Sequence, residues 1–141
     1  MAEPDVYVDV GAMTYSKDTT KVAAKYAVMA EKLMKEAAVG AIHGSPGFTP
    51  YKVGNPDGYY LIAKLTEVSF GTYQGQPSVT SYLSGEVGTY PQPKMLTTSL
   101  TGKGMIGGGT TDGDVAASIK EAMKTMVLKS VIPYLKTKPK A

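Results

Sequence analysis

Two amphipathic helical segments enclose a long run of β-type sequence, and this order restricts the chain to few folds. The first helix is predicted from a cap at Ser16 or Asp18 to about Val39, with Gly40 as its stop. Its apolar positions recur every three or four residues, as one face of a helix requires: Val22, Tyr26, Met29, Leu33 and Ala37.

The last helix is predicted over residues 114–136, with Asp114 as its N-cap. Its apolar residues again follow neighbouring rows of a helical surface. Pro133 is expected to bend or end the helix near Val131, because proline lacks the N–H that a helix interior needs.

Three strand-like segments lie between the helices, at 59–70, 78–90 and 94–106. A fourth strand is predicted at 6–10, where valines alternate strictly, and residues 48–53 are expected to form a short edge strand. The order β-α-β-β-β-α predicts an α+β two-layer sandwich, with a mostly antiparallel sheet and both helices on one face. We expect a single domain over 1–141, with an ordered core from about 5 to 136 and a basic tail over 136–141.

A G-x-G-x-x-G pattern is formed by Gly102, Gly104 and Gly107. A dinucleotide-binding unit needs a further parallel strand with an acidic residue after the helix, and here the predicted helix is the last element. We therefore expect no nucleotide and no other cofactor. Period-two alternation places Leu83 opposite Gly102, and in the same register Gly85 opposite Leu100. The glycines are expected to let a helix dock closely on the sheet.

Composition narrows the possible functions further. All 15 basic residues are lysine, so the bidentate side chain with which proteins read guanine is missing, and sequence-specific nucleic-acid binding is not expected. The chain also has no cysteine, which excludes disulfides, thiolate catalysis and cysteine-ligated zinc.

No catalytic group is predicted. His43 is the one residue suited to proton transfer near neutral pH, but it lies in an expected loop without a partner. Asp112 and Asp114 resemble a calcium loop only faintly and are better explained by helix capping. We expect the chain not to be an enzyme and to hold no metal.

Tyrosines suggest a contact surface instead, since the ring gives a large contact area and the hydroxyl a polar end. The predicted interaction surface consists of tyrosines from the sheet and its loops: Tyr59, Tyr60, Tyr73, Tyr82 and Tyr90. A weaker membrane-surface contact could come from the basic tail, through Lys136, Lys138 and Lys140. The oligomeric state stays open.

The segments GYYLIAKLTEVSF, SVTSYLSGEVGTYPQPKMLTTSLTGKG and DVAASIKEAMKTMVLKSVIPYL resemble, in their order, small bacterial cell-envelope domains. Outer-membrane assembly lipoproteins and the N-terminal domain of Tol-type translocation proteins are of this kind. The resemblance implies a non-catalytic accessory module, periplasmic or otherwise extracytoplasmic, that binds another envelope protein. The sequence contains no lipobox cysteine that would support a lipid anchor, and no functional residue can be transferred from these families to this chain.

Alternatives remain open for both the cellular compartment and the function of this chain. The start MAEPDVYV is not a signal peptide but is compatible with a mature N-terminus after signal removal, and a cytoplasmic location stays open. One alternative function is a structural subunit of a larger assembly, such as a phage or secretion apparatus, that associates through an exposed strand edge. Another is a small-ligand-binding protein with a pocket between the loops at 40–58 and 107–113.

Overall fold

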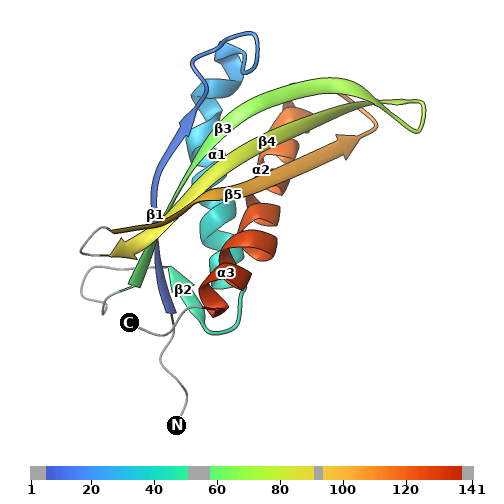
Figure 1. The fold of residues 1–141 in the computed structure, drawn as a ribbon. Coiled ribbons are helices and arrows are strands. Elements are labelled where there is room, and N and C mark those ends of the chain that lie inside the picture. Colours follow the sequence, from blue (N-terminus) through green and yellow to red (C-terminus); the bar gives the residue numbers. More distant parts are fainter. Residues whose placement is uncertain (1–5, 51–57, 91–93, 138–141) are drawn as a thin grey trace.

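An open five-stranded sheet, in the order β2-β1-β3-β4-β5, carries its helices on one face (Figure 1). This is a computed structural model, and it describes residues 6–50, 58–90 and 94–137. The strands are β1 (Val6–Tyr15), β2 (Phe48–Pro50), β3 (Gly58–Tyr73), β4 (Gln76–Tyr90) and β5 (Lys94–Gly107). β1 runs parallel to β2 and β3, whereas the longer ladders between β3, β4 and β5 are antiparallel. The predicted α+β sandwich is confirmed, and β2 forms the first half of the short edge strand expected over 48–53, of which residues 51–53 lie outside the described residues.

Helix α1 (Ala24–His43) begins later and ends later than the sequence predicts. Ser16 and Asp18 do not cap it, because the chain first continues alongside β3. There the N–H of Ser16 donates to the carbonyl of Leu65 at 2.8 Å, and the N–H of Val68 donates to the carbonyl of Lys21 at 2.9 Å. Tertiary pairing with β3 therefore takes precedence over the helical spacing of residues 16–23.

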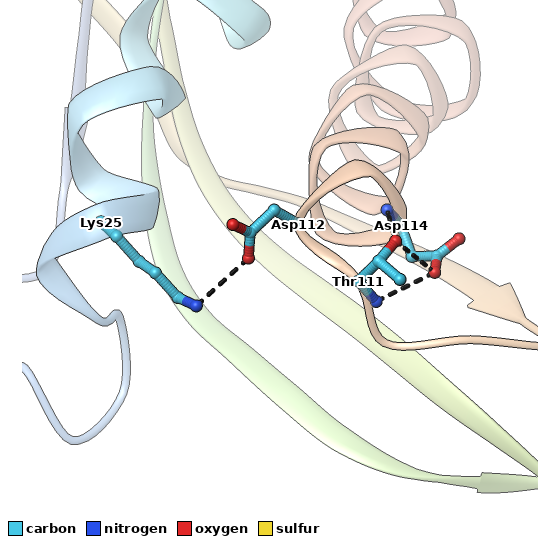
Figure 2. A network of polar contacts seen from close by, with 4 residues as sticks. All are labelled: Lys25, Thr111, Asp112 and Asp114. Atoms are coloured by element: carbon cyan, nitrogen blue, oxygen red, sulfur yellow. Dashed lines mark hydrogen bonds and ion pairs between the residues drawn. The ribbon is translucent and has the colours of Figure 1, made fainter.

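The second helix, α2 (Asp112–Met126), begins with a capping box (Figure 2). Thr111, and not Asp114, is the N-cap: its hydroxyl accepts the N–H of Asp114 at 3.2 Å, while the Asp114 carboxylate accepts the N–H of Thr111 at 3.0 Å. The hydroxyl and N–H of Thr111 lower the pKa of Asp114. Asp112 forms an ion pair of 3.2 Å with Lys25, so α1 and α2 start at the same end of the molecule.

Beyond α2 the helix widens into a π-helical turn, η1 (Val127–Val131), and then resumes as α3 (Ile132–Lys136). The N–H of Ile132 donates to the carbonyl of Val127, five residues back. Pro133 lies at the start of α3, where its missing N–H is tolerated. The wide turn thus accommodates the proline, and the helical segment continues to Lys136, the end of the predicted range 114–136, instead of ending near Val131.

Glycines of β5 allow the closest contact between the two layers. Gly102 pairs with Leu83, and Leu100 with Gly85, in the predicted register. A Cβ atom at Gly102 would lie 2.5 Å from the carbonyl oxygen of Ala122, and one at Gly104 would overlap the backbone of α2. The expected docking of a helix on this glycine strip is confirmed, and the core lies between the sheet and the helices.

Candidate interaction surface

The face of the sheet turned away from the helices is uncovered in the described part of the chain (Figure 1). Residues of neighbouring strands stand side by side on it, since alternate positions of each strand point to the same face. One row runs from Glu67 of β3 through Tyr82 of β4 to Lys103 of β5. A second row runs from Lys64 through Ser84 to Thr101, its neighbour on this face.

Tyr82 is the best-placed tyrosine of this face. Its ring lies 5.7 Å from the Lys103 ammonium group, and Glu67 is its direct cross-strand neighbour. A half-buried ring between a cation and a carboxylate offers a partner an apolar surface with charged groups of both signs at its edge. Lys103 was not singled out from the sequence, although period-two spacing along β5 places it on this face; Glu67 reaches the face only through the register shift between Leu65 and Glu67.

Tyr60 and Tyr59 are adjacent in β3 and therefore point to opposite faces. Tyr60 pairs with Asp9 and Gly88 on the uncovered face, and its ring covers Gly88, where a side chain would overlap it. Tyr59 is only 7% exposed and belongs to the hydrophobic core. The prediction that Tyr59 lies on the interaction surface is wrong, because its strand position turns it toward the helices beside Val8.

The other predicted contact residues do not join this face as one group. Tyr73 is 48% exposed at the end of the β3–β4 hairpin, next to the tight turn at Gln74 and Gly75. Lys136 is exposed at the end of α3. The side chain of Tyr90, and Lys138 and Lys140, lie outside the described residues. The candidate interaction surface is therefore centred on Tyr60 and Tyr82, with Tyr73 at a distance.

The arrangement gives no support to catalysis in the residues that the structure describes. His43 is exposed at the end of α1, and no group of three or more acidic, histidine or cysteine side chains could hold a metal there. Asp112 and Asp114 serve the start of α2, as expected from capping. None of the described helices is long and apolar enough to cross a membrane.

The described parts of the loops at 40–58 and 107–113, between which a ligand pocket was predicted, do not lie together, and residues 51–57 lie outside the described residues. Residues 107–111 precede α2 beside the start of α1, whereas residues 44–50 follow the far end of α1. An α-helix rises about 1.5 Å per residue, so the length of α1 separates them. A groove of about 500 Å³ lies elsewhere, lined by residues of α1 and α2 and by Ile106 of β5, with Glu36, Lys120, Glu121 and Lys124 as its charged residues.

A buried pair of serine hydroxyls was not predicted from the sequence. Ser81 of β4 and Ser118 of α2 lie 2.6 Å apart, both buried, and the Ser118 hydroxyl donates to the carbonyl of Val115 at 2.7 Å. Since a hydroxyl has one hydrogen, Ser81 must be the donor between the two serines. The pair fixes α2 on β4, beside the glycine strip.

Comparisons with known proteins agree with this fold. No protein-family model and no curated protein matches the sequence. The solved structure of CT253 from Chlamydia trachomatis matches at 12% identity and a TM-score of 0.58, over 95% of this chain and 100% of that one. XCC0632 from Xanthomonas campestris, of family DUF330, matches at 13% and 0.54, over 94% and 84%.

A candidate lipoprotein from Caulobacter crescentus matches at 10% identity and a TM-score of 0.53, over 93% of each chain. Identities this low establish likeness of fold alone. The fold is therefore one that this chain has in common with bacterial proteins, one of them named as a lipoprotein, in line with the expected resemblance to envelope domains.

Proposed function

We propose that this chain is a non-catalytic accessory module of a bacterial cell envelope, and that it binds another protein through the uncovered face of its sheet. The observation that carries the proposal is the uncovered face itself. Tyr60 and Tyr82 offer ring surface there, and Lys103 and Glu67 lie beside Tyr82. Aromatic residues are enriched at protein interfaces, and charges of both signs at the edge of a patch favour a specific partner.

An extracytoplasmic location is supported by the likeness of the fold to that of a protein named as a candidate lipoprotein.

Photo-crosslinking in the bacterium that encodes the chain tests this function. A photoreactive amino acid at position 82 is expected to give an adduct with a specific envelope protein on irradiation. The matched control is position 32, where the Lys32 side chain is 83% exposed on α1, on the opposite side of the molecule. Fractionation of the same cells should recover the chain outside the cytoplasm.

A second variant tests whether the crosslinked adduct depends on the charge beside Tyr82 or only on the closeness of another protein. Lys103→Glu reverses the charge beside Tyr82 and is expected to weaken the adduct at position 82 without changing thermal stability, since Lys103 is exposed. Equal adducts at positions 82 and 32, or a chain found only in the cytosol, would contradict the proposed function.

A further inference from the structure

In the part of the chain that the structure describes, no strand pairs with the outer edge of β5, and the backbone of this edge is regular. β5 is the last strand of the sheet, and from Leu100 to Gly107 it pairs with β4 without a register shift. The hydroxyl of Ser130 donates to the carbonyl oxygen of Thr101 at 3.3 Å, from the side of the helical layer. The backbone groups of Thr101 therefore point away from β4, and those of Lys103 and Met105 do the same, because this orientation alternates along a strand.

Helix α2 lies directly above this edge strand. A Cβ atom at Gly104 would be 2.5 Å from the carbonyl oxygen of Ser118 and 2.8 Å from the carbonyl carbon of Glu121. The helix backbone thus rests on β5 itself. A strand added to the edge would lie about 4.8 Å from β5, whereas packed helices need about 8–10 Å between their axes. A second copy of this chain cannot pair there, since the helix above its own edge strand would collide with α2.

A single strand without a helical layer avoids this collision. A hollow of about 580 Å³ is lined by Thr101, Gly102 and Lys103 of β5, by Thr125 of α2, and by residues of β3 and β4, among them Tyr82 and Ser84 on the uncovered face. Positions of an added strand that face the helical layer would lie under the flank of α2 and must be small. Positions that face the other way would lie beside Lys103, so an acidic residue is favoured there.

The opposite side of the sheet is less suitable for strand addition. β2 pairs with β1 only from Val6 to Val8, so among the described residues no strand covers the outer edge of β1 beyond this point. The register of β1 against β3 shifts between Val10 and Met13, and such irregularities interrupt an edge.

We propose that the edge of β5 from Lys103 to Gly107 binds one extended segment of a partner protein as an additional strand. The segment pairs through the outward N–H and C=O groups of Lys103 and Met105, carries small residues toward α2, and carries an acidic residue beside Lys103. This inference rests on the proposed function in that it describes how the protein partner is held.

Selection from a random library of short linear peptides displayed on phage tests the inference without knowledge of the partner. Peptides enriched on the native chain are then measured against two variants. Met105→Pro removes the outward N–H without removing a bond to β4, and Met105→Thr is the matched control that changes the side chain and keeps the N–H. Binding is expected to weaken about tenfold or more in Met105→Pro and to stay unchanged in Met105→Thr.

Amide hydrogen exchange provides a readout that does not depend on a folded proline variant. In the native chain, the selected peptide should slow exchange at Lys103 and Met105. The inference is overturned if no peptide is enriched, if the peptides bind Met105→Pro as well as Met105→Thr, or if protection appears elsewhere. It is also overturned if light scattering shows a dimer of the native chain that Met105→Pro dissociates, since that would mean self-pairing.

The two proposals can fail separately. Peptides that bind the β5 edge, with no specific adduct at position 82 in cells, would leave the edge as a strand-binding site and reject the envelope function. A specific adduct at position 82, with no peptide binding at the edge, would reject strand addition and leave the face-mediated contact intact.

Discussion

Replacing Gly104 by alanine tests the closest contact of the fold with a single methyl group. The added Cβ would overlap the amide nitrogen of Ala122 and approach the backbones of Ser118 and Glu121 within 3 Å. None of these atoms can rotate away, so α2 must retreat from the sheet by roughly 1 Å, which forfeits a quarter to a half of the affected dispersion contacts. Overpacking of this kind costs about 3 kcal/mol, and the entropic advantage of alanine over glycine in a strand returns about 0.5–1 kcal/mol.

The expected net loss is therefore about 2–2.5 kcal/mol, or a Tm lower by roughly 6–10 °C for a domain of this size. Thermal unfolding followed by circular dichroism measures it. Gly71→Ala is the matched control, because Gly71 also lies in a strand, while its added Cβ would meet only the Ser78 hydroxyl, at 3.9 Å. Gly71→Ala should leave the Tm unchanged or raise it. Equal Tm values for the two variants would refute the claim that backbone contact with α2 requires glycine at position 104.

Two further predictions concern polar contacts. Ser118→Ala should lower the free energy of unfolding by about 1–3 kcal/mol in chemical denaturation, because it leaves the buried Ser81 hydroxyl without an acceptor. Ser81→Ala should cost less, since the Ser118 hydroxyl keeps its bond to the carbonyl of Val115. Equal losses in the two variants would reject Ser81 as the donor. Thr111→Val removes the N-cap and should cost about 1 kcal/mol near neutral pH. Because Thr111 lowers the pKa of Asp114 below its ordinary 3.8, the contribution of the capping box is complete above that pH and is lost as the pH falls further. The difference in Tm between Thr111→Val and the native chain should therefore shrink in acid, and a difference that stays constant would show that the carboxylate does not take part.

The register of the glycine strip could be predicted from the sequence because a strand repeats every two residues. Once β4 and β5 form a hairpin, Leu83 must face Gly102 if their apolar positions share one face. The start of α1 could not be predicted in this way. Residues 16–23 have helical spacing, but their backbone is held by bonds to β3, from Leu65 and Val68, which are distant in sequence.

The residues of the candidate interaction surface could likewise be predicted only in part, because strand pairing is not visible in the sequence. Tyr59 and Tyr60 are chemically identical neighbours, and only the pairing of Tyr59 with Val8 decides which of them is buried. The cross-strand neighbours of Tyr82 follow from the strand register. The register does not show that β5 is the edge strand of the sheet, because this depends on the strand order. Sequence periodicity thus assigns side chains to faces, while strand order, set by tertiary contacts, decides which face and which edge remain open.

The parallel pairing of β1 with β3 has a consequence for how the chain reaches its native state. The β3–β4–β5 meander joins strands that follow one another, so it can form with little loop-closure entropy, whereas β1 must wait for β3 across the whole of α1. During synthesis, the valine-rich Val6–Tyr15 segment leaves the ribosome well before its pairing strand exists. We expect this early segment to be the part of the nascent chain most in need of a chaperone, and the docking of β1 to be the slow step of refolding.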